Sequence, residues 1–226
     1  MVAPVITIDG PSGSGKGTLC QMLAAELNWH LLDSGALYRI VGLAAERKGI
    51  DFDDGAALAE LAVSLEVKFK PSVAGEPSAV ILNGEDVSAA VRAETTGALA
   101  SKVAVHDPVR QALKELQRSF LTAPGLVADG RDMGTVIFPA APLKIYLTAS
   151  VEERAERRFK QLKNKGESVN LAALSEDVQL RDERDMNRAV APLKPAADAV
   201  VIDSTATAVE EVFVKVLKCV KAVYKI

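Results

Sequence analysis

The stretch ITIDGPSGSGKGT, residues 6 to 18, decides the fold class, because it joins a short apolar run to a turn with four glycines. The run PVITID, residues 4 to 9, is typical of a buried strand, and TLCQMLAAELN, residues 18 to 28, has apolar residues at helical spacing. Glycines between a strand and a helix let successive backbone N–H groups turn inward around phosphate oxygens, and the helix N-terminus adds partial positive charge. The G-x4-G-K spacing therefore predicts a phosphate-binding loop, formed by Gly10, Pro11, Ser12, Gly13, Ser14, Gly15, Lys16, Gly17 and Thr18.

One position departs from the common pattern of such loops. Lys16 supplies a mobile cation for the terminal phosphates, and a hydroxyl group normally follows this lysine directly and ligates Mg²⁺. Here Gly17 follows the lysine, and Thr18 comes one residue later. Thr18 is then either a metal ligand, directly or through water, or simply a residue of the first helical turn. The loop alone does not separate kinases from ATPases and GTPases.

The composition and net charge of the chain exclude several classes of protein. The 226 residues are 49% hydrophobic, which is enough for one ordinary core. The net charge of −3 gives no overall attraction to nucleic acid or to an anionic membrane, so an anion site must be a local cluster of arginines and lysines. No apolar run approaches the ~20 residues of a membrane span, and the N-terminus leads directly into a predicted strand without a signal-peptide pattern. We expect a cytoplasmic enzyme.

The remaining apolar runs alternate with helical patterns. This alternation predicts an α/β fold, a parallel sheet covered by helices. Residues 64 to 88 depart from this pattern of strands and helices, because they alternate like antiparallel strands joined by turns. We interpret them as part of an insertion on the core. The strand-like runs are HLLDSG at 30 to 35, GLVADG at 125 to 130, LKIYLTA at 143 to 149 and AVVIDS at 199 to 204.

A kinase needs cations beyond its phosphate loop, because phosphoryl transfer brings two anionic groups together in line. The first set lies in DSGALYR, residues 33 to 39, at the end of a predicted strand. Ser34 can cap the following helix and Arg39 lies within that helix. A capping serine and a surface arginine are the structural alternative.

The second set, VADGRDMG at residues 127 to 134, also ends a predicted strand, where the ligands of parallel sheets collect. Asp129 is placed to orient hydrated Mg²⁺, and Arg131 is suited to bind a phosphate with two hydrogen bonds. Asp132 can accept a hydrogen bond from an amino group on a base. A tight turn with a surface ion pair is the alternative interpretation.

The third set is EERAERRF, residues 152 to 159, with Arg154, Arg157 and Arg158. Arg154 and Arg158 are neighbours on a helix, and like charges there are unfavourable. Either an anion approaches them or the adjacent glutamates neutralise them. The NKGE sequence that follows at 164 to 167 resembles the guanine-reading NKxD motif, but it follows a basic helix, and we interpret it as the turn that ends this helix.

The fourth set is LRDERDMNR, residues 180 to 188. Helical spacing places Arg181, Arg184, Asp185 and Arg188 along one face. Three arginines and one acid suit a nucleotide, with cations for phosphate or a base carbonyl and a carboxylate for ribose hydroxyls. An exposed, salt-bridged helix is the alternative.

Together, GPSGSGKGT, HLLDSGALYR, GRDMGTVIFP, RDERDMNR and PLKPAADAVVIDST resemble bacterial-type cytidylate kinases of the nucleoside monophosphate kinase family. The likeness covers nearly the whole chain in the same order. The first motif is general to the family, and the others are more specific. The resemblance implies one P-loop NTPase domain over 1–226 with a three-layer α/β core, an NMP-binding region at about 35–125 and a short helical lid at about 151–168.

The resemblance also implies the reaction and its residues. ATP would phosphorylate CMP or dCMP by direct in-line transfer with Mg²⁺, and Thr18 and Asp129 would hold the metal. The catalytic set would be Lys16, Asp129, Arg131 and Arg158. Residues 10 to 18 would hold ATP together with the lid arginines Arg154, Arg157 and Arg158. The acceptor nucleotide would meet Ser34, Arg39, Ser101, Arg110, Arg131, Asp132, Arg181, Asp185 and Arg188.

Within that set, the resemblance implies a division of roles. The cytosine pocket would be formed by Ser34, Ser101, Arg110, Asp132 and Arg188. Arg39, Arg131 and Arg181 would meet the acceptor phosphate or the sugar near it, and Asp185 would hold sugar hydroxyls. The partners are small molecules, without nucleic acid or membrane, and we expect a monomer.

Two other functions stay open at this stage. A kinase for another small acceptor, such as UMP, AMP or shikimate, would share the phosphate loop. A nucleotide-switch protein would also share it, although the missing NKxD motif and the additional arginine sets weigh against a switch. Turnover with a panel of acceptors separates these alternatives.

Overall fold

The computed structural model describes residues 3–70, 79–164 and 166–225, and its internal contacts divide the chain into two compact units. One unit joins Met1–Leu32 to Leu121–Ile226, and the other is Asp33–Phe120. Each unit is described by itself below. The predicted insertion at 64 to 88 falls within the second unit.

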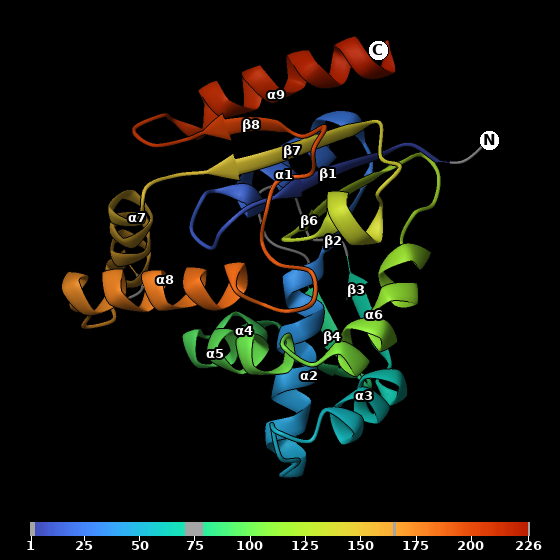
Figure 1. The fold of residues 1–226 in the computed structure, drawn as a ribbon, viewed down its shortest axis with the longest axis vertical. Coiled ribbons are helices and arrows are strands. Elements are labelled where there is room, and N and C mark those ends of the chain that lie inside the picture. The colour runs from blue at the N-terminus through green and yellow to red at the C-terminus, as the bar shows by residue number, and fades with distance from the viewer. Residues whose placement is uncertain (1–2, 71–78, 165, 226) are drawn as a thin grey trace. The chain divides into compact units, whose positions relative to one another are not determined.

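The first unit is built on a five-stranded sheet in the order β2-β6-β1-β7-β8 (Figure 1). Strand β1 runs parallel to both β6 and β7, and β7 runs parallel to β8, which confirms the predicted parallel sheet. The register pairs Ile8 with Asp129 and Asp9 with Gly130, so the ends of β1 and β6 lie side by side. The strands are β1 (Val5–Asp9), β2 (His30–Asp33), β6 (Leu126–Gly130), β7 (Leu143–Thr148) and β8 (Val200–Asp203).

Helices α1 (Lys16–Leu27) and α9 (Val209–Tyr224) share one apolar core with the central strands (Figure 1). Alternate residues of β1, such as Ile6 and Ile8, point into this core, as the period of a strand requires. Burying these side chains stabilises the sheet edge that carries the phosphate loop. The core residues include Ile6, Ile8, Leu19, Cys20, Leu23, Val127, Ile145, Leu147, Val212, Val216 and Val220.

Two further helices of this unit, α7 (Val151–Asn164) and α8 (Leu171–Met186), pack against each other. The side chain of Asn170 caps α8 by accepting the backbone N–H groups of Ala172 and Ala173. At the end of α7, the Gly166 N–H donates to the Lys163 carbonyl and the Glu167 N–H to the Leu162 carbonyl. These bonds confirm that NKGE ends a helix, as predicted. A single turn of π-helix, η1 (Met133–Ile137), follows β6.

The second unit, residues 33–120, combines helices with a small antiparallel sheet in the order β3-β4-β5. Val67 pairs with Leu82, and Ile81 pairs with Asp86, which confirms the antiparallel strands predicted for this stretch. Residues 71–78 of that prediction lie outside the described residues. The elements are α2 (Ser34–Lys48), α3 (Gly55–Ser64), β3 (Val67–Lys70), β4 (Ala79–Leu82), β5 (Glu85–Asp86), α4 (Ser88–Arg92), α5 (Glu94–Val103) and α6 (Asp107–Ser119).

The helices of both units are too short or too polar to cross a bilayer, as far as the described ranges of the chain go. The longest of them, α8 and α9, each have 16 residues. The charged residues of α8 lie between Glu176 and Asp185, and its first five residues are uncharged.

Candidate active site

The phosphate loop has the predicted strand–loop–helix arrangement. Strand β1 ends at Asp9, and α1 begins at Lys16. Gly10, Gly13 and Gly15 all have positive φ, which side chains of L-residues rarely adopt. A Cβ at Gly10 would also lie only 1.9 Å from the Leu147 carbonyl oxygen of β7. Glycine is therefore required there both by the turn and by the neighbouring strand.

Lys16 is buried at the start of α1. Its Nζ donates to the Pro11 carbonyl oxygen at 2.7 Å, so the ammonium group is held within the loop itself. Burial lowers the pKa of Lys16, while the carboxylate of Asp129 acts in the opposite direction. The structure thus brings the loop lysine near Asp129 of β6, which sequence reasoning placed at the same sheet edge.

Asp129 also lies beside Gly17. A Cβ built on Gly17 would be 3.6 Å from Asp129 Oδ2, so the position where most such loops have a hydroxyl faces this carboxylate. Carboxylate and hydroxyl oxygens are hard ligands of the kind Mg²⁺ prefers, and Mg²⁺ is usually held by one or two carboxylates together with phosphates and water. No group of three or more His, Cys, Asp or Glu forms a protein-only cage among the described residues. The Asp129 carboxylate has the chemistry of such a ligand, and Thr18 is an exposed residue of the first turn of α1.

A cluster of opposite charges forms where β6 ends. The Arg131 guanidinium makes an ion pair with Asp185, and the Arg188 guanidinium lies 3.9 Å from the same carboxylate. Burial raises the pKa of Asp185, but Arg131 and Arg188 outweigh it and hold the pKa below its usual range. Burial likewise opposes the charge of Arg131, but the carboxylates of Asp185, Asp129 and Asp182 together outweigh burial and raise the pKa of Arg131. We call Arg131, Asp185 and Arg188 the acceptor cluster.

The acceptor cluster corrects the predicted helix face. Arg188 lies beyond the last residue of α8, Met186, and its Nη2 donates to the Ala191 carbonyl oxygen. Arg184 is exposed, and its Nε donates back to the Leu180 carbonyl oxygen. The helical spacing predicted that Arg181, Arg184, Asp185 and Arg188 would lie along one face. Arg181 and Arg188 do lie near Asp185, whereas Arg184 is exposed and Asp182 is buried in its place. The helix ends two residues before Arg188.

Two more residues that were predicted to bind the acceptor lie close to the acceptor cluster. Asp132 follows Arg131 directly and is buried. Arg181 is half-buried on α8 and contributes to the low pKa of Asp185 after the larger effects of burial, Arg131 and Arg188. These residues and the acceptor cluster belong to the same unit as the phosphate loop.

Sequence reasoning missed Asp9, the last residue of β1. Its two carboxylate oxygens accept the backbone N–H groups of Met133 and Gly134, each at 2.8 Å. These two residues follow Arg131 and Asp132 directly, so Asp9 fixes the turn that carries them. Burial raises the pKa of Asp9 to about 6 despite these two bonds. The sequence signal that could have identified Asp9 is its position directly before the glycine-rich loop.

The three arginines of α7 have separate environments. Arg154 is buried and forms an ion pair with Asp182 of α8. Arg157 pairs with Glu153 one turn earlier on α7 at 2.8 Å, while Arg158 donates to Gln161 at 3.1 Å. The predicted neutralisation by adjacent glutamates therefore holds for Arg157, whereas the acid that neutralises Arg154 comes from another helix.

In the second unit, the two predicted residues of α2 have distinct surroundings. Asp33 caps the helix by accepting the Ala36 N–H, so the predicted cap at Ser34 is wrong, because Ser34 is already the first helical residue. Ser34 is buried. Arg39 Nη1 donates to the carbonyl oxygens of Val91 and Ala93, both at 3.0 Å, where α4 meets α5.

Ser101 and Arg110, which only the resemblance identified, lie on α5 and α6. Ser101 Oγ donates to the Gly97 carbonyl oxygen one turn earlier. Arg110 is buried, and its guanidinium carbon lies 5.8 Å from the centre of the Tyr38 ring. A Cβ on Gly97 would come within 3.0 Å of Arg39 Nη2, so α2 and α5 approach closely in this unit.

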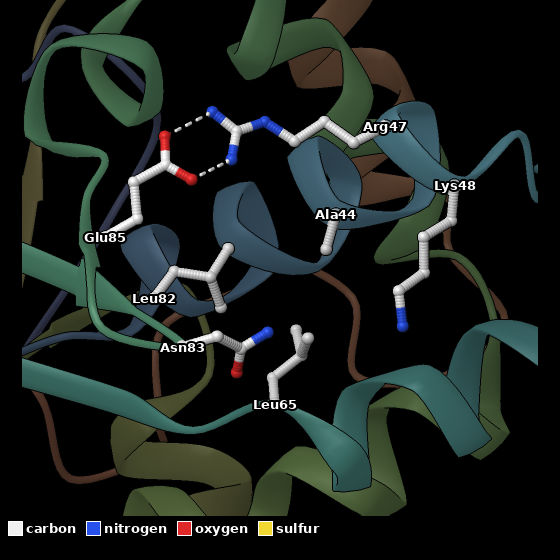
Figure 2. A pocket seen from close by; sticks show the side chains of 7 residues that line it. All are labelled: Ala44, Arg47, Lys48, Leu65, Leu82, Asn83 and Glu85. Carbon is white, nitrogen blue, oxygen red and sulfur yellow. Dashed lines mark hydrogen bonds and ion pairs between the residues drawn. The ribbon is translucent and has the colours of Figure 1, made fainter.

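A small cavity of about 130 Å³ opens elsewhere in the second unit. Figure 2 shows Arg47 reaching across it to Glu85, with an ion-pair distance of 2.8 Å. It contains none of the predicted site residues, and both partners of the ion pair are largely exposed. Its lining combines a small apolar floor with a polar rim, formed by Ala44, Arg47, Lys48, Leu65, Leu82, Asn83 and Glu85.

Comparison with known proteins identifies the family of the chain. The family model described as cytidylate kinase matches residues 6–222. The cytidylate kinase of Aeromonas hydrophila is 58% identical over 216 residues, which are 96% of this chain and 93% of that protein. The cytidylate kinase of Pseudomonas entomophila is 58% identical over 95% of this chain and 94% of its own length.

Solved structures support the fold alone. A structure of an uncharacterized protein from Eubacterium ventriosum covers 97% of this chain and 98% of its own, with a TM-score of 0.52 and 11% identity. The α/β P-loop fold with its helices and small antiparallel sheet is thereby consistent with the sequence matches. The chain belongs to the cytidylate kinase family.

Proposed function

We propose that the chain transfers the γ-phosphate of ATP to CMP or dCMP, giving ADP and CDP or dCDP. One observation carries this proposal within the molecule. The phosphate loop and the acceptor cluster lie in one unit, and β1 and β6, whose ends carry them, pair side by side. A donor site and an acceptor site at neighbouring strand ends suit a direct transfer between two bound nucleotides.

The proposed donor site is the loop of residues 10 to 18. Its N–H groups and Lys16 bind the β- and γ-phosphates, and the arginines of α7 belong to the same site. Mg²⁺, when bound, neutralises phosphate charge, and Asp129 and Thr18 are the residues that would hold it. Lys16 leaves the Pro11 carbonyl when a phosphate oxygen offers a charged partner, because a charge-assisted bond is the stronger one.

The residues proposed for the acceptor are given for each unit by itself. In the first unit they are Asp132, Arg181 and the acceptor cluster, and in the second unit they are Ser34, Arg39, Ser101 and Arg110. In the first unit, Arg131 and Arg188 already share one carboxylate, so an incoming phosphate competes with Asp185 for Arg131. The released carboxylate of Asp185 then accepts sugar hydroxyls.

No strong general base is needed for the transfer, because a phosphate monoester is mostly ionised at neutral pH, with a second pKa of about 6. Catalysis then consists of positioning and charge neutralisation by Lys16, Arg131 and Arg158. Residues 151–168 form the proposed lid and residues 35–125 the proposed NMP-binding region. Closure of the lid would exclude water, which otherwise accepts the phosphoryl group. We propose a cytoplasmic monomer whose partners are these nucleotides.

A coupled assay of ADP release with a panel of acceptors tests the proposal. CMP and dCMP should stimulate ADP release, and AMP and shikimate should not. Stimulation by AMP above that by CMP would reassign the acceptor. Hydrolysis of ATP at the same rate with every acceptor would contradict a kinase and favour a nucleotide switch.

A further inference from the structure

The phosphate loop is held from outside by three side chains that are distant in sequence. Arg154 Nη1 donates to the Ser12 carbonyl oxygen at 3.1 Å, and Arg157 Nη1 donates to the Ser14 carbonyl oxygen at 3.3 Å. Ser204, the residue after β8, has its hydroxyl 3.1 Å from the same Ser14 carbonyl oxygen and 3.0 Å from the Thr148 carbonyl oxygen, and it donates to one of them at a time. We call Arg154, Arg157 and Ser204 the carbonyl clamp.

The loop holds one more of its carbonyl groups by itself. The Pro11 carbonyl oxygen accepts Lys16 Nζ at 2.7 Å and Ser14 Oγ at 3.0 Å. The carbonyl oxygens of Pro11, Ser12 and Ser14 therefore all have donors. Two of these three depend on the carbonyl clamp, which lies outside the loop.

Fixing a carbonyl group also fixes the N–H group that follows it. In a planar trans peptide unit, the C=O of one residue and the N–H of the next point in opposite directions. Donors on the Ser12 and Ser14 carbonyls therefore turn the N–H groups of Gly13 and Gly15 away from the clamp. These N–H groups are the kind that line a phosphate-binding loop.

The carbonyl clamp acts on the two peptide units that reverse most easily. Gly13 has φ +80° and Gly15 has φ +92°, and glycine adopts positive and negative φ about equally readily. Reversal of either unit would present a carbonyl oxygen, instead of an N–H, to the phosphate. A loop with these glycines therefore needs an external restraint to keep its donors oriented.

The clamp arginines are themselves rigidly held. Arg154 also donates to the Ala149 carbonyl at 2.9 Å and pairs with Asp182. Arg157 donates to Glu153 and, through Nη2, to the Ser204 carbonyl at 2.6 Å. A guanidinium group has only five N–H donors, so most of each group is committed to the protein.

Close packing adds a second constraint. A Cβ on Gly13 would lie 3.1 Å from Arg154 Cβ, and a Cβ on Gly15 would lie 3.8 Å from Arg157 Nη1. Helix α7 thus packs against the phosphate loop at Gly13 and Gly15. A movement of α7 would change the donors available to the loop carbonyls.

We infer that Arg154, Arg157 and Ser204 are positioning residues, which orient the phosphate-binding N–H groups of Gly13 and Gly15 through the carbonyls behind them. This inference rests on the proposed function and changes the role of two arginines that the family resemblance assigns to direct contact with ATP. Ser204 has no charge, and its hydroxyl also accepts Arg157 Nη1 at 3.1 Å, so its effect on phosphate binding passes through the Ser14 carbonyl or through the orientation of Arg157. Ser204→Ala therefore tests positioning without removing a charge.

The test compares ligands with and without phosphates. Calorimetry with ADP and an NMR titration with adenosine are performed on the wild-type chain, Ser204→Ala and Arg157→Lys. Loss of one hydrogen bond predicts an affinity for ADP that is about threefold to tenfold lower in each variant. Adenosine affinity and the KM for CMP should change less than about twofold. The amide signal of Gly15 should shift in both variants, and that of Gly13, whose preceding carbonyl is held by Arg154, should shift less.

The double variant tests whether Arg157 and Ser204 act together, as their direct hydrogen bond and their shared carbonyl both predict. Arg157 and Ser204 act on the same carbonyl, so their combined effect on ADP affinity should be smaller than the product of the single effects. Independent, multiplicative effects would overturn the inference, because they would mean that Arg157 binds phosphate separately from Ser204. Equal losses for ADP and adenosine, or no loss for Ser204→Ala, would also overturn it.

Thr207→Ala is the matched control, because its hydroxyl donates at 3.2 Å to the Thr205 carbonyl within the same connection. It should leave ADP affinity unchanged. Should the double variant fail to fold, the ratio of ADP affinity to adenosine affinity in each single variant still tests the inference. A wild-type chain that binds ADP but does not phosphorylate CMP would contradict the proposed function and leave this test valid.

Discussion

The phosphate loop and the acceptor cluster belong to the same unit but are assembled in opposite ways. The loop is contiguous, and its internal bonds are short in sequence, such as that from Lys16 to Pro11 five residues earlier. The acceptor cluster joins Arg131 to Asp185 across 54 residues. The internal bonds of the loop therefore depend on its local sequence, although its Ser12 and Ser14 carbonyls are held by distant residues, whereas the cluster exists only after the sheet and α8 are in place.

The charges of the two regions are also handled differently. In the loop, the cation Lys16 rests on a neutral carbonyl, so a phosphate meets little competition for it. In the acceptor cluster, the cations already face a carboxylate, so the nucleotide must exchange partners with Asp185. We expect substitutions in the loop to lower turnover most, and substitutions in the acceptor cluster to lower the affinity for the acceptor nucleotide.

The largest effect is expected for Lys16→Ala. Removing the cation that neutralises the transferred phosphate should lower turnover about a thousandfold, the upper range for a single electrostatic contact. CMP affinity, measured by calorimetry, should stay within about threefold of the wild-type value. An equal loss of CMP affinity would contradict separate donor and acceptor sites.

Asp182→Asn is expected to have the second-largest effect. It leaves the buried Arg154 without its ionised partner, which should lower the free energy of unfolding by about 3 kcal/mol in urea denaturation. ADP affinity should fall as well, because Arg154 also holds the Ser12 carbonyl. Glu156→Gln, in an exposed ion pair with Lys160, is the control and should leave stability unchanged. Equal stability of the two variants would contradict a structural role for Asp182.

Asp9 links the two regions, since it ends β1 and binds the turn after Arg131. Burial raises its pKa from 3.8 to about 6, with Asp132 and Lys16 as the nearest charged groups. Between these values the unfolded carboxyl is ionised and the folded one is not, so the stabilising contribution of Asp9 is complete below about pH 4 and is lost as pH rises to about 6. The difference in unfolding free energy between wild type and Asp9→Asn should therefore fall by about 3 kcal/mol across this range. A difference independent of pH would contradict the raised pKa.

Asp185→Ala should weaken both CMP and dCMP binding by about tenfold, as loss of a charged hydrogen-bond partner predicts. ATP affinity should be unaffected, which distinguishes the cluster from the loop. Glu183→Ala, an exposed acid on the same helix, serves as the control. A loss for both acceptors assigns Asp185 to the 3′-hydroxyl, whereas a loss confined to CMP would assign it to the 2′-hydroxyl.

The smallest effect is expected for Gly17→Ser, which restores the usual hydroxyl of the loop. The new Cβ would make an ordinary contact with Asp129 at 3.6 Å, so turnover should stay within about threefold. Initial rates at varied Mg²⁺, with Gly17→Ala for comparison, provide the measurement. A tenfold loss in both variants would show that the glycine itself is needed beside Asp129.

Much of the fold was predictable because its signals are local. The glycine spacing and the apolar run before it predicted β1, the loop and α1, and the alternation at 64 to 88 predicted antiparallel strands. The spacing along α8 predicted the approach of Arg188 to Asp185 but was wrong for Arg184, which is exposed, because helical spacing does not show which side of a helix is buried. Ser34 failed as a cap because Asp33, one residue earlier, accepts the same kind of bond.

By itself, the sequence determined the phosphate loop, the order of strands and helices, and the arginine-rich segments, since each depends on residues a few positions apart. Only the tertiary structure decided the partners of those segments. Asp9 meets Gly134 across 125 residues, Arg154 meets Ser12 across 142, and Ser204 meets Ser14 across 190. Spacing along a chain carries no information about such contacts, because they arise from the order in which parallel strands pair and from the helices that return over them.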